Sequence, residues 1–299
     1  MRTIRVRIII FTAVASLASQ AMAQTITARE VVERIQREVG VPWNEPTVDT
    51  FKAGDPATPV TGVAVTMMAT LDVLKRAAAA GHNLVITHEP TFFDHQDPTD
   101  ALVTAKDPVI EAKLRFIRDH SMVVWRFHDY SHRKRPDLIQ AGVLRALGWS
   151  AYQDRDAPWL VRIPDTTLNA VAAHVAERLG AHDIRVVGNP ASRITNVALL
   201  PGASGFGAHR RRLAEPDVHL LIAGEAQEWE TVEYVDDAIA AGLNKSLILV
   251  GHIPSEQPGM EDATAWIRSF VPEVPVVFVP AKDPFWTDRR DAGGPPRRR

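Results

Sequence analysis

The chain has 299 residues, 45% of them apolar, with 34 basic and 36 acidic side chains, no cysteine and 11 histidines. This length accommodates one large or two ordinary domains with a substantial core. The formal charge of −2 argues against a nucleic-acid partner, because phosphate neutralisation needs a surplus of Lys and Arg. The absence of cysteine excludes disulfides, thiolate metal sites and cysteine nucleophiles, so any bound metal must have nitrogen and oxygen ligands.

The N-terminus has the pattern of an export signal. Three arginines precede an apolar run over residues 8–17, and an A-x-A cleavage pattern ends at Ala23. The run is shorter than the roughly 20 apolar residues of a membrane-spanning helix. We therefore expect residues 1–23 to be cleaved, with an uncleaved anchor as the alternative. The mature chain would begin at Gln24, have 276 residues and be periplasmic or secreted, without stable membrane insertion.

The composition changes again at the C-terminus. Residues 286–299 contain five arginines, two aspartates and a Gly-Gly-Pro-Pro run, which predicts a flexible basic tail. The body over residues 24–285 has 26 basic and 34 acidic side chains and hence a net charge of −8. Such a body suits cations better than polyanions.

The first half of the body alternates predicted strands and helices. Thr27 and Glu30 form a capping box ahead of apolar residues at helical spacing. Strands are expected at 62–68, 84–87 and 122–125, and helices at 70–80, 106–119 and 136–147. We expect this first α/β lobe, residues 24–150, to end at a boundary near residue 150.

The same alternation continues through a second lobe, residues 151–285. Strands are expected at 160–163, 184–187, 194–200, 220–223, 246–250 and 276–279, and helices at 167–179, 226–241 and 260–270. Short, wholly apolar strands separated by helices indicate sheets that are covered on both faces. The predicted fold is therefore α/β, with two related lobes that have mixed, mostly covered sheets.

Candidate metal ligands follow three of the predicted strands. They are His88 and Glu89 after the second strand, His128 and His132 after the third, and His252 and Glu256 after the strand at 246–250. Loops at the C-terminal ends of strands converge in open α/β sheets, which would place a site there, between the lobes. Each pair alone is weak, since Glu256 could instead serve a helix N-terminus. Four imidazoles and two carboxylates are about what two divalent ions need.

Four common motifs are excluded. His88-Glu89 begins like HExxH, but Pro90 would break the required helix and residue 92 is Phe. The glycine-rich stretch 202–207 fits neither a P-loop nor G-x-S-x-G, so we expect a turn on the floor of the site. Ser131 and His132 are adjacent and cannot form the hydrogen bond between a nucleophile and its base.

Four blocks of sequence together resemble the NGG-interacting-factor-three-like family, also called GTP cyclohydrolase 1 type 2-like. The blocks are residues 60–93, FHDYSH at 127–132, LLIAGE at 220–225 and GHIPSE at 251–256. The last block is similar to the family signature GH-x-x-[ST]E, and the resemblance extends from about residue 28 to 285. It implies a dinuclear metal centre and a toroidal homohexamer.

The resemblance assigns the six candidate ligands with two exchanges of residue type. Where the family has His-His-Pro, this chain has His88-Glu89-Pro90, and where the family has His with Asp four residues later, it has His128 and His132. The third pair is retained as His252 and Glu256. Because four imidazoles and two carboxylates remain, we expect a rearranged but working centre for two Zn, Mn, Fe or Co ions.

For other polar residues near the predicted strand ends, the argument for a role in the site is weaker. Glu225 matches a Thr-Gly-Glu motif of the family, so it is our candidate catalytic residue, as a general base or by orienting a ligand; helix capping is the alternative. Asp72 also matches a family residue, but it opens a helix and is expected to cap it. His95, between Asp94 and Asp97, is close enough in sequence to face the site, although we favour no ligand role for it; His82 is expected in a turn and His174 within a helix.

Two functions are compatible with these residues. The first is a metal-dependent hydrolase of a small-molecule substrate, in which a hydroxide that bridges two ions is the nucleophile. The alternative is a non-catalytic metal-binding or assembly protein of the same family. A phosphoester and a cyclic amide are both open as substrates, whereas cytosolic GTP does not suit an exported chain.

Overall fold

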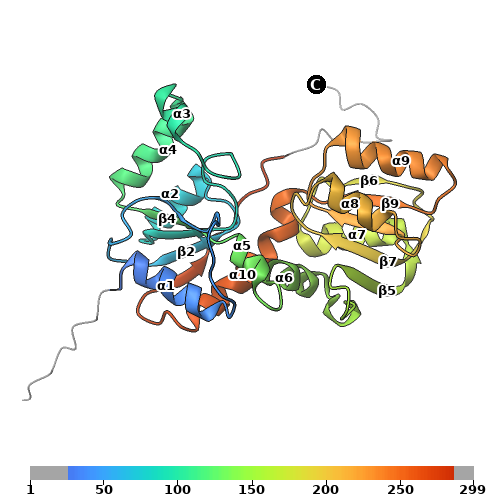
Figure 1. Cartoon of the computed structure of the whole chain (residues 1–299), viewed down its shortest axis with the longest axis horizontal. Helices are drawn as coiled ribbons and strands as arrows, with labels where there is room; N and C mark the ends of the chain where they lie inside the picture. The colour runs from blue at the N-terminus through green and yellow to red at the C-terminus, as the bar shows by residue number, and fades with distance from the viewer. Residues whose placement is uncertain (1–25, 286–299) are drawn as a thin grey trace, which may run out of the picture.

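The structure is a computed structural model that describes residues 26–285. It is an α/β protein with two five-stranded sheets, as the sequence predicted (Figure 1). The predicted export signal, residues 1–23, and the predicted basic tail, residues 286–299, lie outside the described residues. Within residues 26–285, no helix is both long and apolar enough to cross a membrane.

The first sheet has the strand order β1-β4-β3-β2-β10. The bounds are Phe51–Ala53 for β1, Val123–Arg126 for β4, Leu84–Thr87 for β3, Val63–Thr66 for β2 and Val276–Phe278 for β10. The strands from β4 to β10 run parallel, and β1 is antiparallel at one edge. Every residue of β2, β3 and β4 is buried, which is typical of parallel strands covered on both faces.

Helices cover both faces of the first sheet. Successive side chains of a strand point to opposite faces, and those of β2, β3 and β4 are mostly apolar on both, so both faces need a cover. The helices are α1 (Ala28–Glu38), α2 (Leu71–Ala79), α4 (Pro108–Asp119) and α10 (His252–Arg268), while α3 (Asp100–Thr104) has no buried residue and lies against α4. Val63 and Val65 contribute to a core with α1 and α10, whereas Ala64 and Val85 contribute to one with α2 and α4. The predicted capping box of Thr27 is present at the start of α1.

The second sheet has the strand order β5-β7-β8-β9-β6. The bounds are Leu160–Thr167 for β5, Arg193–Leu200 for β7, Leu220–Ala223 for β8, Ser246–Leu249 for β9 and Arg185–Val187 for β6. The three inner strands are parallel and both edge strands are antiparallel. One face packs against α6 (Leu138–Leu147) and α7 (Leu168–Leu179), and the other against α8 (Phe206–Leu213) and α9 (Glu233–Ala240).

Helix α10 connects the two sheets. It follows β9 of the second sheet, packs against α6, and leads into β10, which pairs with β2 in the first sheet (Figure 1). A Cβ atom added to Gly142 of α6 would lie 2.5 Å from the Cα of Gly259 in α10, so the two helix backbones are in direct contact. The strand predicted at 276–279 thus belongs to the first sheet, although the sequence-based division assigned it to the second lobe.

Two predicted helices differ from the structure. The helix expected at 260–270 begins at His252, because Pro254 lies in its first turn, where no intrahelical N–H bond is lost. The helix expected at 226–241 is a π-helical turn, Glu228–Val232, followed by α9. Strand β1 and helices α3, α5 (Asp129–Arg133) and α8 were not predicted.

Candidate metal centre

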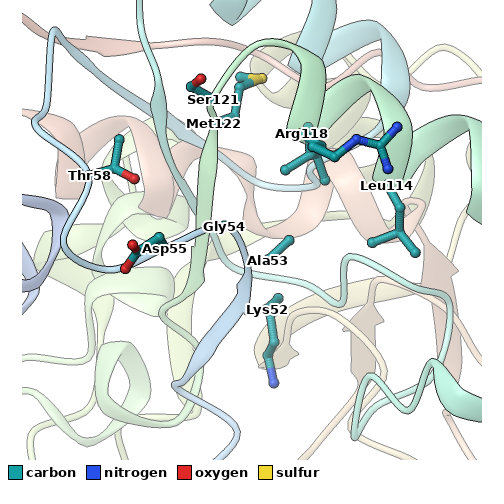
Figure 2. A pocket seen from close by; sticks show the side chains of 10 residues that line it. Lys52, Ala53, Gly54, Asp55, Thr58, Leu114, Arg118, Ser121 and Met122 are labelled. Atoms are coloured by element: carbon teal, nitrogen blue, oxygen red, sulfur yellow. The ribbon is translucent and has the colours of Figure 1, made fainter.

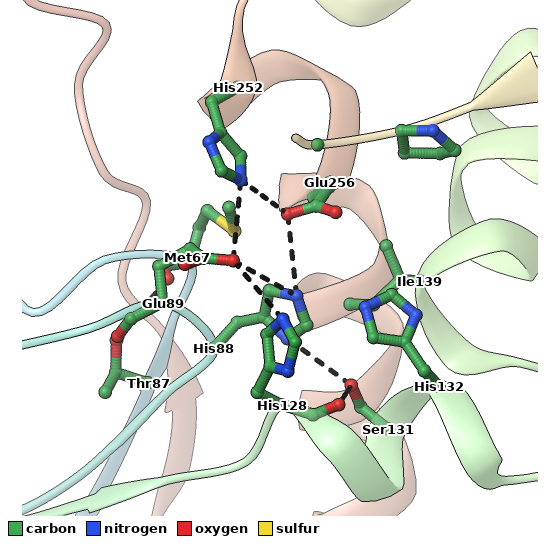
Figure 3. A network of polar contacts seen from close by, with 12 residues as sticks. Met67, Thr87, His88, Glu89, His128, Ser131, His132, Ile139, His252 and Glu256 are labelled. Atoms are coloured by element: carbon green, nitrogen blue, oxygen red, sulfur yellow. Dashed lines mark hydrogen bonds and ion pairs between the residues drawn. The ribbon is translucent and has the colours of Figure 1, made fainter. Parts of the chain in front are cut away.

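Three chain segments bring six polar side chains together between the sheets (Figure 3). His88 and Glu89 directly follow β3, and His128 and His132 lie at the start and in the body of α5 after β4. These segments leave the same sheet edge because Thr87 and Arg126 are paired in the parallel register. His252 and Glu256 occupy successive turns of one face of α10. All six predicted ligands therefore lie in one cluster.

One oxygen of Glu89 lies at the centre of this cluster. Glu89 Oε1 is 3.7 Å from Nε2 of His88, 3.7 Å from Nε2 of His128 and 3.4 Å from Nε2 of His252. Glu256 Oε2 lies 3.5 Å from Nε2 of His88 and 3.1 Å from Nε2 of His252. Ligands about 2.0–2.1 Å from a tetrahedral ion are about 3.3 Å from one another. The separations in the cluster therefore match those of atoms that share a metal ion.

The third histidine of the first lobe completes the cluster. The ring centroid of His132 lies 5.1 Å from that of His88 and 5.2 Å from that of His128. Ligand atoms of these three residues all lie within 4.8 Å of one another, as do those of His88, Glu89 and Glu256. Both groups could hold a metal ion.

Each of the four imidazoles is anchored through Nδ1, so that Nε2 faces the cluster. The partners are the Phe127 carbonyl for His88 (3.2 Å), Asp129 for His128 (3.0 Å), Asp137 for His132 (3.0 Å) and Glu225 for His252 (3.3 Å). Metal-binding histidines characteristically have such a partner on the other ring nitrogen. Nε2 of His88 is fully buried and has no hydrogen-bond partner among the described residues, which fits a nitrogen that ligates a metal.

Backbone groups beside the candidate ligands are also fixed by short contacts. The buried carboxylate of Asp49 accepts hydrogen bonds from the backbone N–H groups of His128, Asp129 and Tyr130 at 2.7–2.9 Å. This fixes the turn that carries His128. Gly202, in the predicted glycine-rich turn, lies against Glu256, because a Cβ atom there would be 2.2 Å from Glu256 Oε1.

The electrostatics leave both carboxylates ionised. Burial raises the pKa of Glu89, but hydrogen bonding to His252 and the neighbouring His88 outweigh it and lower the pKa to about 2. Burial likewise raises the pKa of Glu256, and His88 and His252 bring it well below the ordinary value. Metal ligation requires deprotonated ligands, so both glutamates are in the ligating state at neutral pH.

His128 and His252, both partly buried, differ in their titration. Burial and the neighbouring His88 lower the pKa of His128 to about 4, so its ring is neutral at pH 7. Burial also lowers the pKa of His252, but Glu225, Glu256 and Glu89 together raise it well above the ordinary value. Three carboxylates thus surround His252, and this position attracts a cation.

Glu225 lies two residues after the end of β8 and contacts His252 rather than capping a helix. The following helical turn has Gln227 at its N-cap, which removes the capping alternative. The side chain of Glu225 is 57% exposed, and its pKa is lowered by the hydrogen bond with His252. It is therefore an ionised carboxylate at the edge of the cluster, in contact with one candidate ligand.

Of the residues with weaker cases, His95 adjoins the cluster, whereas His82, His174 and Asp72 have contacts elsewhere in the fold. His95 lies beside His128, with ring centroids 5.3 Å apart. His82 lies against Gly62, and His174 hydrogen bonds to the Leu147 carbonyl. Asp72 lies in the first turn of α2 and pairs with Arg76 at 2.9 Å, while Thr70 caps the helix.

Sequence reasoning missed the residues that support the ligands. Asp49, Asp129 and Asp137 hold the histidine rings or their turn, and no spacing rule identifies them. Arg126 is fully buried beside Glu89. The sequence did contain a sign of Arg126, because a charged residue ends the otherwise apolar strand β4.

A cavity of about 780 Å³ adjoins the cluster through Glu225 and His252. Met68, Ile184 and Phe285 give it apolar walls, and charged residues also line it. Its size is that of a small-molecule site. Another cavity, of about 500 Å³, is lined by residues of β1, the following turn and α4, and includes none of the six cluster residues (Figure 2).

The fold and the cluster define a two-sheet α/β protein whose residues could hold a metal ion. A family model described as Duf34/NIF3 (NGG1p interacting factor 3) matches residues 47–284. Because this match covers most of the chain, the protein belongs to the Duf34/NIF3 family, as the sequence resemblance indicated. A comparison with curated proteins found no match.

Solved structures share the fold. A Bacillus cereus protein related to NIF3 has a TM-score of 0.69 and 13% identity, over 88% of this chain and 99% of that chain. A hypothetical protein of Staphylococcus aureus has a TM-score of 0.67 and 14% identity, over 88% and 100%. Reduced HcgD from Methanocaldococcus jannaschii has a TM-score of 0.59 and 13% identity, over 85% and 98%. At these identities the similarity concerns the fold.

Proposed function

We propose that the protein is a metal-dependent hydrolase of a small molecule, with two divalent ions per chain held by the six clustered residues. The observation that carries this proposal is the orientation of the four imidazoles: each is held through Nδ1, and Nε2 of His88, His128 and His252 lies within 3.7 Å of the ionised Glu89 carboxylate. When bound, ions such as Zn, Mn, Fe or Co supply a Lewis acid and activate water near neutral pH.

The chain itself supplies the other parts of a hydrolytic site. The cavity beside His252 binds the substrate, and its apolar walls orient the non-reacting part. Glu225 lines this cavity and is ionised, so it accepts a proton during the reaction and keeps His252 oriented. Phosphoesters and cyclic amides are both substrates that such a site can hydrolyse.

Metal content and chelator-sensitive turnover test this proposal. The mature protein is expected to contain about two metal ions per chain by elemental analysis and to hydrolyse one of the phosphoesters, cyclic nucleotides or cyclic amides in a panel. Chelation should abolish turnover, and His252→Ala should lose metal. Glu225→Gln should retain most of the metal but lose at least about 100-fold in kcat.

The same experiment distinguishes the hydrolase from the alternative, a non-catalytic protein. Tight metal binding without turnover on any substrate class would support a non-catalytic metal-binding or assembly protein. Less than one metal ion per chain would contradict both functions. His120→Gln is a matched control, because His120 is an exposed histidine at the C-cap of α4 whose ring contacts Phe116 rather than the cluster.

We also propose that the mature protein is exported and forms a homohexamer. The arginine-rich start, short apolar run and A-x-A pattern support export. N-terminal sequencing of the protein from cells should begin at Gln24, and retention of Met1 would contradict cleavage. Light scattering should give six times the chain mass, and a monomer at micromolar concentration would contradict the assembly.

A further inference from the structure

A fully buried arginine lies directly behind the candidate metal centre. Arg126 is the last residue of β4 and has no exposed surface. Its Nε–H donates to the His88 carbonyl at 3.0 Å, and Nη1 donates to the His95 carbonyl. Both acceptors are backbone atoms, so they fix the plane of the guanidinium. A buried arginine without a charge partner is costly, and Arg126 has one nearby carboxylate on the metal side.

That carboxylate belongs to Glu89, and its two oxygens face different partners. Oε2 lies 3.6 Å from Nη2 of Arg126. Oε1 instead faces Nε2 of three imidazoles at 3.4–3.7 Å. The carboxylate of Glu256 faces two of these imidazoles, those of His88 and His252. Among the carboxylate oxygens of the cluster, Oε1 of Glu89 is therefore the most centrally placed.

We propose that Arg126 is a positioning residue that holds Oε2 of Glu89 away from the metal ions, so that Glu89 ligates through Oε1 alone. This inference rests on the proposed metal centre and deepens it. A carboxylate can bind a metal with one or both oxygens, and a guanidinium that engages one oxygen removes the second mode. Oε1 of Glu89 would then be shared by the histidines of the first lobe and His252 of α10. Arg126 would limit the number of oxygen atoms that Glu89 contributes to the metal ions.

The same contacts explain why a lysine cannot replace Arg126. The guanidinium donates to two carbonyl groups at once, and its Nη2 lies 3.6 Å from one carboxylate oxygen and 3.5 Å from Nδ1 of His95. A lysine has a compact charge without this fixed planar arrangement. It would keep the charge balance but leave Glu89 free to rotate.

A double-mutant cycle tests the coupling between Arg126 and Glu89. Zn²⁺ affinity is measured by competition with a chromophoric chelator for the wild type, Arg126→Met, Glu89→Ala and the double variant. Removal of a residue that orients a metal ligand characteristically costs about 10–100-fold in affinity. We expect Arg126→Met to cost this much in the wild type and less than about threefold in the Glu89→Ala background. Equal losses in both backgrounds would overturn the inference, since Arg126 would then only brace the loop.

The Co²⁺ spectrum gives a readout that bracing alone does not change. Bidentate binding by Glu89 raises the coordination number, so the visible absorption of Co²⁺-loaded Arg126→Met should weaken at saturating metal. Arg126→Lys should show the same weakening with a smaller loss of affinity. An unchanged spectrum in both variants would overturn the inference.

A measurement on the wild type covers the case in which Arg126 variants fail to fold. In a crystal structure of the Zn²⁺-loaded protein, Oε1 of Glu89 should lie on the metal and Oε2 within hydrogen-bond distance of Arg126. Both oxygens on metal would overturn the inference. A wild-type chain that binds no metal would overturn the proposed function as well, so the two failures are distinguishable.

Discussion

At the scale of single residues, the four histidines of the cluster share one arrangement: Nδ1 is hydrogen bonded outward and Nε2 points inward. Three of the four outward partners are carboxylates, those of Asp129, Asp137 and Glu225. A carboxylate on the outer nitrogen fixes both the tautomer and the ring orientation, and it makes the inner nitrogen more basic. In the proposed centre, the outer partners would therefore contribute to metal affinity without contacting the metal.

Asp129→Asn tests this contribution. The amide keeps the shape of the side chain but removes the negative charge beside Nδ1 of His128, so we expect metal affinity to fall by about 10-fold with little change in melting temperature. Chelator competition and thermal denaturation measure the two effects. Asp236→Asn, on the exposed face of α9, is the matched control. Unchanged affinity in Asp129→Asn would contradict the prediction.

The lowered pKa of His128 predicts how acid affects the metal-free protein. Its pKa is about 4 in the folded chain against the ordinary 6.5, because burial and His88 disfavour the charged ring. Between these values the unfolded chain binds a proton that the folded chain does not, so the free energy of unfolding falls as the pH is lowered. The contribution of neutral His128 to the free energy of unfolding is complete above pH 6.5 and is lost as the pH falls toward 4.

His128→Gln should remove part of this dependence. We expect the loss in unfolding free energy between about pH 7 and pH 4.5 to be smaller than in the wild type by about 1–3 kcal/mol. Urea denaturation in the presence of chelator measures it at both pH values. His120→Gln should keep the wild-type slope, and a His128→Gln slope equal to that of the wild type would refute this assignment.

At the scale of elements, the cluster depends on how α10 is held against its neighbours. The helix places His252 and Glu256 on one face, and its backbone meets α6 at Gly142 and Gly259. On the other side, the turn at Gly202 lies against the Glu256 carboxylate. Small residues at these contacts allow the ligand-bearing helix to approach both lobes closely.

Gly142→Ala should therefore separate α6 from α10. The added methyl group would lie 2.5 Å from the Cα of Gly259, and we expect a loss of about 1–3 kcal/mol in unfolding free energy. Gly207→Ala, in α8, is the control, because its Cβ would meet no atom within 4 Å. That substitution should stabilise the helix by about 0.5–1 kcal/mol. Equal effects of the two substitutions would show that the contact is unimportant.

Gly202→Ala probes the contact with Glu256. Gly202 has φ of +67°, and its added Cβ would lie 2.2 Å from Glu256 Oε1. Gly180→Ala imposes a similar strain, at φ of +62°, but its Cβ would meet nothing within 4 Å. Both variants should lose about 1–2 kcal/mol of stability through the left-handed backbone. Only Gly202→Ala should also lose metal affinity, as isothermal titration calorimetry would detect; retained affinity would contradict the close contact.

At the scale of the whole molecule, the sequence predicted the strands and the cluster better than the connections between the lobes. Apolar runs such as those of β3 and β4 are unambiguous because both faces are buried, and the polar residues after them had to meet at one sheet edge. The start of α10 was hidden, because Gly251 and two prolines resemble a loop. The partner of β10 depends on distant parts of the chain, so no local pattern identifies it.

The residues that support the candidate ligands also depend on long-range contacts, which the sequence does not reveal. His88 and His252 stand at strand ends and could be found by position. Asp49 is separated from His128 by 79 residues and reaches it only through the pairing of β1 with β4. A buried carboxylate that binds three backbone N–H groups has no sequence signature, because its partners are the same in every residue type.

The return of the chain to its first sheet has a consequence for the order of folding. β2 gains its outer neighbour, β10, only after residue 276 has been made, and the cluster lacks two of its side chains until α10 is complete. A ribosome-bound or prematurely ended chain therefore has neither a finished first sheet nor a full set of ligands. Occupancy of the metal centre would thus report that synthesis and folding have both reached the far end of the chain.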